Sequence, residues 1–340
     1  MLRLIRVLPL LLGTAMVLCS TPSDAQSVDL GWTHWDSSNQ VLFSEPRGEG
    51  LVFRAYPSST SQNINFFRDF AGLQKFYIQS VTAGPDGTAL VAATLRLRDR
   101  QPKALILTYR PSGELLNKWE PGPQDPDVIS YVSDDDVVFV LGDSNLPNDE
   151  ENYPLLVEYT RDGQILKKLI PTSKLKDGGE SLSGSGANGD PALRVTKDKI
   201  YLYAPKNREV LIFDRSGQIL TSRSIRDAID RLSSGNGYHI QQTHHVDFTD
   251  EGDVVLELLM GNDDTHSYQM DVVRVSVKTG EAIVVHKAFN SGRFWFIGMK
   301  GDQYLYVEGG EHLYLQANAA QEPVPLTEDA IASGQTGHTN

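Results

Sequence analysis

The chain has 340 residues, of which 40% are hydrophobic and 22% charged, and this is the composition of a soluble globular protein. A net charge of −13 argues against a nucleic-acid-binding protein, because a phosphate backbone requires a basic surface. Glycine and proline, at 29 and 17 residues, are too few for a collagen-like or low-complexity chain.

The N-terminus has the pattern of an export signal. Arg3 and Arg6 precede an apolar run over residues 7–19, which is too short to span a bilayer comfortably. The small residues Ser23 and Ala25 predict cleavage after Ala25, so residues 1–25 form a signal peptide. The mature protein is then expected to be periplasmic or secreted. An uncleaved membrane anchor is the alternative interpretation.

The single cysteine, Cys19, lies inside this segment. A lipoprotein would carry its lipid on this residue, but Leu18 stands where lipoproteins have a small residue, so lipidation is the less favoured interpretation. Cleavage leaves 29 basic and 43 acidic residues and a net charge of −14. Because the mature chain has no cysteine, disulfide bonds, thiolate nucleophiles and cysteine-bound zinc are excluded.

The remaining chain repeats a pattern of two short strands joined by a tight turn rich in Asp and Gly. These residues suit hairpin turns because they accept a positive φ. The turns occur at residues 84–87, 133–136, 196–199, 249–252 and 300–302. A second hairpin follows each of the first four, and its turn carries Gly113, Gly163, Gly217 or Gly280. These glycines are 50, 54 and 63 residues apart, which indicates a four-stranded unit of about 50 residues.

A four-stranded unit of this length predicts an all-β fold, the β-propeller of antiparallel blades. Five repeats begin near residues 76, 127, 191, 243 and 293. Residues 28–75 contain further strand-like segments, which form a sixth blade or complete the last one. We expect six blades, with five or seven as alternatives and a β-sandwich as the competing fold. The domain is expected over residues 26–326, followed by a flexible polar tail over 327–340.

Three turn segments share a strand that ends in an aromatic residue and the pattern x-x-[SD]-G-x-[IL]-L, at residues 108–116, 158–166 and 212–220. In this motif the chain resembles six-bladed propellers of the NHL-repeat and TolB-like types, over roughly residues 76–320. The resemblance implies the fold. Calcium-dependent lactonases and esterases share that fold, but their ligand set has no residue-by-residue match in this sequence.

Two insertions interrupt the repeat. Residues 176–190 are rich in Gly and Ser and are expected to form a loop, and residues 224–235 place Ile225, Ile229 and Leu232 on one helical face. We expect a short surface helix there. Another short helix, or a packed loop, is expected around residues 66–73.

The connections of a four-stranded blade divide between its two ends. The first-to-second and third-to-fourth turns lie at one end, and in this chain they are short. The other connections are long and polar, at residues 97–103, 121–128, 142–154, 171–190, 222–243 and 260–270. Functional residues concentrate on long loops held by a rigid scaffold. We therefore expect the functional site on the face that carries these long connections, the long-loop face.

Two acidic segments on the long-loop face are candidate metal sites. They offer oxygen ligands of the kind that calcium prefers, at Asp143, Asn145, Asp149 and Glu151 and again at Asp263 and Asp264. The first segment lacks the spacing and central glycine of an EF-hand loop. A solvated acidic loop and a plain turn are the alternative interpretations.

A candidate ligand-binding site contains His239, His244, His245 and Asp247. A histidine in the central channel can act as a metal ligand or a general base. Strand alternation places His244 and His245 on opposite faces of the sheet, so we expect only one of them to face the channel. A hydrogen-bonded or exposed histidine is the alternative.

The sequence contains no nucleophile elbow, zinc-protease motif or phosphate-binding loop. We therefore predict an exported, non-catalytic and monomeric propeller that binds a protein, a peptide or a saccharide, without a transmembrane segment or a nucleic-acid partner. The alternative is a propeller hydrolase, lactonase or lyase with a divalent cation such as calcium at the channel mouth. Convergence of three or more of the candidate ligands within metal-ligand distance at the channel mouth would favour the enzyme, and dispersed, solvated side chains would count against it.

Overall fold

The computed structural model describes residues 33–36, 41–44, 50–55, 61–98, 100–122, 124–144, 154–175, 182, 189–234, 237–289, 294–308 and 312–326. The expected signal peptide, Cys19 and the tail over 327–340 lie outside these ranges, so the bounds of the mature domain stay a prediction. No helix among the described residues is long and apolar enough to cross a bilayer.

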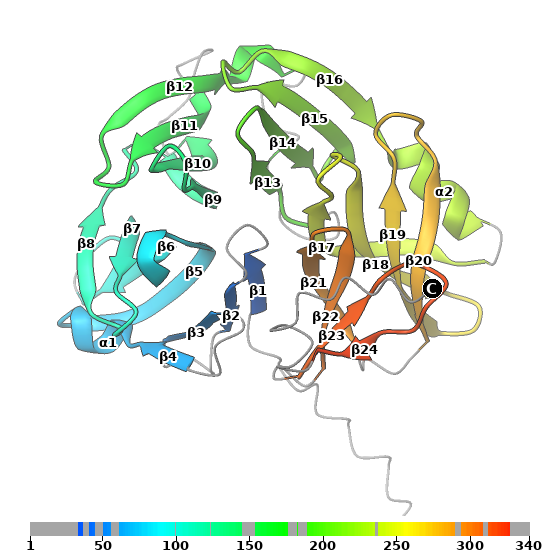
Figure 1. The fold of residues 1–340 in the computed structure, drawn as a ribbon, viewed down its shortest axis with the longest axis horizontal. Coiled ribbons are helices and arrows are strands. Elements are labelled where there is room, and N and C mark those ends of the chain that lie inside the picture. Colours follow the sequence, from blue (N-terminus) through cyan, green and yellow to red (C-terminus); the bar gives the residue numbers. More distant parts are fainter. Residues whose placement is uncertain are drawn as a thin grey trace, which may run out of the picture. The chain divides into compact units, whose positions relative to one another are not determined.

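Six four-stranded antiparallel sheets account for the strands, and each sheet is built from four consecutive strands (Figure 1). Blade 1 contains β1 (Thr33–Asp36), β2 (Val41–Ser44), β3 (Leu51–Ala55) and β4 (Ser61–Ile64). Blade 2 contains β5 (Leu73–Ala83), β6 (Ala89–Leu97), β7 (Lys103–Tyr109) and β8 (Leu115–Trp119). Blade 3 contains β9 (Gln124–Val132), β10 (Val137–Ser144), β11 (Pro154–Thr160) and β12 (Ile165–Pro171).

Blade 4 contains β13 (Ala192–Val195), β14 (Lys199–Ala204), β15 (Glu209–Asp214) and β16 (Ile219–Ser224). Blade 5 contains β17 (His239–Phe248), β18 (Val254–Asn262), β19 (Ser267–Val275) and β20 (Ala282–Phe289). Blade 6 contains β21 (Trp295–Lys300), β22 (Gln303–Glu308), β23 (His312–Gln316) and β24 (Val324–Pro325). The helices are α1 (Phe66–Asp69) and α2 (Arg226–Ser234), with single 3-10 turns at Pro85–Gly87 and Thr172–Lys174.

The six-bladed β-propeller predicted from the repeats is confirmed. The inner strands β1, β5, β9, β13, β17 and β21 contact one another in this order, and β21 contacts β1. Residues 33–64 form a complete blade of their own, so the N-terminal strands do not complete the last blade. The β-sandwich alternative is wrong because the sheets form a closed ring of six.

The apolar core is divided among the interfaces between blades. It consists of six clusters of buried residues, and each cluster takes its members from two adjacent blades. In β6, for example, Leu90 packs toward blade 3 and Val91 packs toward blade 1, and both are fully buried. A middle strand is therefore buried on both faces, which explains the continuous apolar runs in the sequence.

The predicted third-to-fourth turns are confirmed. Gly113, Gly163 and Gly217 have φ values of +78°, +88° and +82°. The N–H of each glycine donates to the carbonyl oxygen three residues earlier. A register shift follows in the adjoining strand pair. This is a type I turn with a bulge, in which the left-handed position favours glycine.

The insertion between blades 4 and 5 contains the expected helix. In α2, Ala228 and Ile229 are buried with the preceding Ile225 in the cluster between these blades. The short helix expected near residue 66 is α1. Most of the Gly/Ser-rich insertion lies outside the described residues.

Polar side chains on the inner strands bind the backbone of the next blade. Asp36 Oδ2 in β1 accepts hydrogen bonds from the Ala83 N–H at 2.7 Å and the Thr82 hydroxyl at 2.8 Å in β5. Thr82 Oγ1 in turn accepts the Tyr131 N–H of β9 at 3.2 Å. Arg194 of β13 donates to the Phe248 carbonyl oxygen of β17.

Blades 5, 6 and 1 are joined in the same way. Asp247 Oδ2 in β17 accepts the Met299 N–H of β21 at 2.7 Å. The carbonyl oxygen of Met299 accepts a hydrogen bond from Trp35 Nε1 in β1 at 3.1 Å. This last bond links the final blade to the first one and helps to close the ring.

Gly298 lies where these contacts meet. Its φ is +146°, and an added Cβ would lie 2.9 Å from Asp247 Oδ2 and 3.2 Å from Trp35 Cδ1. We predict that Gly298→Ala lowers the free energy of unfolding by about 2–4 kcal/mol, because strain and crowding add. Urea denaturation measures the loss. Gly301→Ala is the control, since φ is +59° and no atom lies within 4 Å of its added Cβ. We expect the control to cost about 1–2 kcal/mol, and equal losses would contradict the argument.

Candidate functional site

A cavity of about 420 Å³ lies on the axis of the propeller and is lined by residues of all six inner strands. Three histidines contribute to its wall: His34 from β1 and His244 and His245 from β17. Asp247 from the same strand also lines it. The structure thus brings together three of the four residues of the predicted ligand-binding site.

Strand alternation, the basis for expecting only one of His244 and His245 to face the channel, is interrupted at these two residues. The pairing of β17 with β18 shifts register between Thr243, opposite Leu258, and Val246, opposite Leu256. The bulge adds one residue to β17, and regular alternation fails across it. As a result, both histidines line the axial cavity.

The environment of the cavity favours neutral imidazoles. Burial lowers the pKa of His245 to about 4, with further lowering from the nearby His244 and His34. Burial also lowers the pKa of His244, and it lowers the pKa of His34 although Asp36 partly opposes this. At neutral pH each ring therefore offers one hydrogen-bond donor and one acceptor.

Two of the carboxylates that line the cavity, Asp36 and Asp247, accept hydrogen bonds from the backbone. Burial raises the pKa of Asp247 to about 6, and Arg194 and the N–H groups of Phe248 and Met299 partly offset this. Asp247 Oδ1 accepts the Phe248 N–H and Oδ2 accepts the Met299 N–H, each at 2.7 Å. Asp36 Oδ2 accepts hydrogen bonds from Thr82 and Ala83 of β5. Both side chains therefore hold inner strands together.

His239 lies apart from the other candidate ligands, at the first position of β17. Its Nδ1 is 3.8 Å from Asp263 Oδ2, and both side chains are at least half exposed. Asp264 follows in the exposed turn before β19, where its N–H donates to Asn262 Oδ1. These residues form a solvated turn rather than part of the axial cavity.

The first acidic segment can be followed only in part. The backbone of Asp143 pairs with Asp125 between β10 and β9. Asn145, Asp149 and Glu151 lie outside the described residues, and their role stays a prediction. Within the part of the chain that the structure describes, no three His, Asp or Glu side chains are arranged to hold a metal ion.

Several cavity residues were not singled out from the sequence, notably His34, Asp36, Asp190 and Arg194. Three of them belong to first strands of blades, and Asp190 lies two residues before the start of one. Because first strands line the axis of a propeller, their position in the repeat is the signal that would identify them. The first of these strands, β1, lies in the segment where the repeat is least regular.

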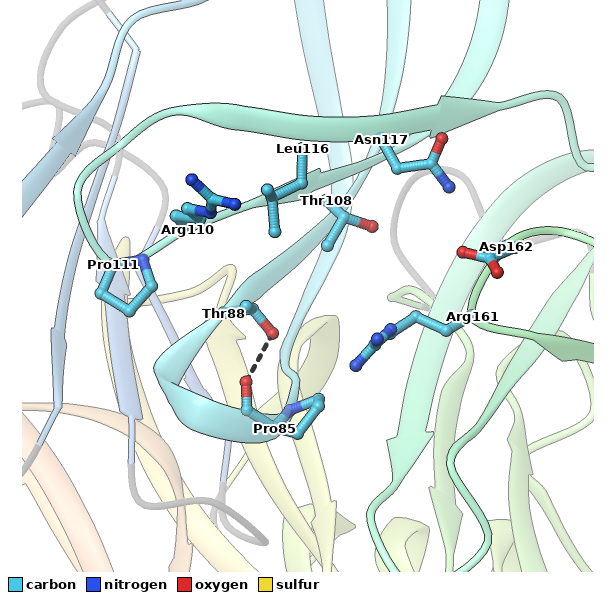
Figure 2. A pocket seen from close by; sticks show the side chains of 9 residues that line it. All are labelled: Pro85, Thr88, Thr108, Arg110, Pro111, Leu116, Asn117, Arg161 and Asp162. Carbon is cyan, nitrogen blue, oxygen red and sulfur yellow. Dashed lines mark hydrogen bonds between the residues drawn. The ribbon is translucent and has the colours of Figure 1, made fainter.

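A second cavity, of about 660 Å³, lies between blades 2 and 3 at the end that carries the short turns. Figure 2 shows Arg110 and Pro111 from a turn of blade 2 and Arg161 and Asp162 from the corresponding turn of blade 3. No site was expected at this end, because its turns are short and regular and the long polar loops lie at the other end.

Comparison with known proteins gives similarity in fold alone. No protein-family model and no curated protein sequence matches the chain. The structure of YCF48 bound to D1 peptide has a TM-score of 0.45 at 8% identity, covering 87% of this chain and 82% of that one. A candidate exported protein from Bacteroides fragilis has a TM-score of 0.44 at 10% identity, covering 82% and 78%. The Dos1 propeller has a TM-score of 0.41 at 9% identity, covering 87% and 83%. These values carry no statement about function.

The depressed pKa of His245 has a measurable consequence. Because the unfolded chain binds this proton below about pH 6.5 and the folded chain does so only near pH 4, stability is gained as the pH rises across this window. We predict that His245→Gln reduces the gain in unfolding free energy between pH 4 and pH 7 by about 2–3 kcal/mol.

Urea denaturation at the two pH values tests this prediction, and His312→Gln, an exposed position in blade 6, controls for loss of a histidine. Asp247 acts in the opposite direction, because a raised carboxyl pKa removes stability as the pH rises from about 4 to 6. The two effects partly cancel in the wild type. An unchanged pH dependence in His245→Gln would show that the imidazole is not held neutral.

Proposed function

We propose that the protein is a non-catalytic propeller that binds an uncharged, hydrogen-bonding segment of a partner in its axial cavity. The observation that carries this proposal is the wall of three partly buried imidazoles, His34, His244 and His245. Neutral imidazoles pair with groups that both donate and accept hydrogen bonds. Peptide amides and saccharide hydroxyls are such groups, whereas an anion would require a cation in the wall.

The single cationic side chain that lines the described part of the cavity is already committed to the scaffold. Arg194 donates to the Phe248 carbonyl oxygen and pairs with Asp250. This argues against an anionic ligand. The cavity volume of about 420 Å³ accommodates a short peptide segment or a small saccharide rather than a folded domain.

Metal-dependent hydrolysis is less well supported. Asp36 and Asp247 direct carboxylate oxygens at backbone N–H groups of neighbouring blades, which leaves fewer lone pairs for a cation. His239 and Asp263 lie in an exposed turn away from the cavity wall. The export pattern at the N-terminus adds to the proposal that the partner is extracytoplasmic. That the protein acts as a monomer stays a prediction.

The proposal predicts that a ligand selected from peptide and glycan arrays binds through His244. We expect His244→Ala to weaken binding at least tenfold, because its ring contributes a donor and an acceptor to the wall. His312→Ala, at an exposed position, should leave the affinity unchanged. Array screening followed by calorimetry measures both. Wild-type affinity in His244→Ala would move the binding site away from the axis.

A separate measurement distinguishes binding from metal-dependent catalysis. A cation that binds the native state must raise the melting temperature. We predict that millimolar Ca²⁺ or micromolar Zn²⁺ leaves the melting temperature of the metal-stripped protein within about 1 °C. A rise of several degrees that is lost in Asp247→Asn would overturn the non-catalytic proposal and favour the hydrolase.

A further inference from the structure

The cavity between blades 2 and 3 contains a buried polar group without a partner. Thr108 is 3% exposed, and its Oγ1 has no hydrogen-bond partner among the described residues. Figure 2 shows this hydroxyl directed to the side of the pocket where Asn117 and Arg161 lie. Because a buried hydroxyl without a hydrogen bond costs free energy, its orientation into a cavity points to a ligand.

The neighbouring interface, between blades 3 and 4, shows what the same positions hold elsewhere in this chain. Arg161 and Arg215 each lie two residues before the glycine of a third-to-fourth turn. Thr108 and Glu158 each directly precede a tyrosine of the third strand, and both face the next blade. Arg215 and Glu158 are therefore the counterparts of Arg161 and Thr108.

Between blades 3 and 4 these positions form an ionic cluster. Glu158 Oε1 lies 4.0 Å from Arg215 Nη2, and Oε2 lies 3.8 Å from Lys167 Nζ. Glu158 is paired with Lys167 across the hairpin, as Thr108 is paired with Asn117. The interface between blades 2 and 3 thus keeps the arginine but has a hydroxyl for the carboxylate and an amide for the ammonium group.

From this comparison we propose that the pocket between blades 2 and 3 binds a carboxylate group, presented by an acidic peptide side chain or by a free organic acid. The group occupies the place that Glu158 fills in the next interface. Arg161 supplies the positive charge, and the Thr108 hydroxyl and the Asn117 amide supply hydrogen-bond donors.

Among the described charged side chains around the pocket, Arg161 is the cation without a close ion pair. Arg161 has Asp136 of its own blade at 3.7 Å, beyond hydrogen-bond distance, so its donors are not all used by that pair. Arg110 forms an ion pair with Glu114 at 2.8 Å. With Asp162 also at the pocket, a doubly charged phosphate would be repelled more strongly than a carboxylate.

Binding is tested with a labelled, end-blocked pentapeptide that has one central glutamate among glycines, and with the same peptide carrying glutamine. By fluorescence anisotropy at low salt we expect the glutamate peptide to bind at least tenfold more tightly, and Arg161→Gln to abolish the difference. Arg231→Gln, on α2, is the matched control and should retain it.

Competition with glutarate separates the two sources. Displacement at concentrations similar to those of the peptide assigns the site to free acids, and retention of the peptide assigns it to acidic segments. Equal affinity for the two peptides, or undiminished preference in Arg161→Gln, would overturn the proposal. Neither result bears on the axial cavity, because none of the described residues lines both pockets.

A second experiment supplies the carboxylate from the chain itself. Thr108→Glu restores the side chain found at Glu158, and we expect it to melt about 2–4 °C above the isosteric Thr108→Gln. In an Arg161→Gln background the difference should disappear. A Thr108→Glu variant that melts at or below Thr108→Gln in the presence of Arg161 would overturn the proposed charge complementarity.

Discussion

The propeller depends on hydrogen bonds in which side-chain oxygens of the inner strands accept backbone N–H groups of the next blade. An inner strand is the edge of its sheet, so one row of its N–H and C=O groups has no partner within the blade. These groups face the axis or the neighbouring blade, where unsatisfied backbone is costly. Asp36 and Asp247 supply carboxylate oxygens for them, and Ser80 and Thr82 supply hydroxyls. The same bonds set the spacing between blades and determine how the six apolar clusters close.

This use of polar residues changes how the axial cavity is interpreted. A channel that is rich in aspartate suggests catalysis or metal binding when only the residue types are considered. Here the carboxylates of Asp36 and Asp247 bind the neighbouring blades, and His244 is the side chain of the wall on which the proposed ligand contact rests. A functional site can therefore be recognised in this fold by the polar groups that the scaffold does not use.

The sequence allowed prediction of the architecture because turn glycines recur at nearly constant spacing and each blade has the same order of strands. It also grouped His244, His245 and Asp247, which line the axial cavity, in one candidate site, but it included His239, which lies apart from that cavity. The orientation of the two histidines was not predictable, since one added residue in β17 reverses the alternation. The contrast between Thr108 and Glu158 is visible in the sequence, but its meaning depends on which blade each residue faces. Which blade each residue faces is determined by strand register and packing, and it cannot be read from the residue types.

The way in which the ring closes has a consequence for its mechanics. Each of the other interfaces joins blades that follow one another directly in the chain, whereas blades 6 and 1 meet without such a link. Their contact includes one apolar cluster around Trp35 and the hydrogen bond from Trp35 to Met299. This interface thus resembles the binding of two tethered partners, whose encounter is governed by the effective concentration that the other five interfaces impose. Any loosening of the other interfaces lowers that effective concentration. The stability of the interface between blades 6 and 1 therefore depends on the rigidity of the whole propeller.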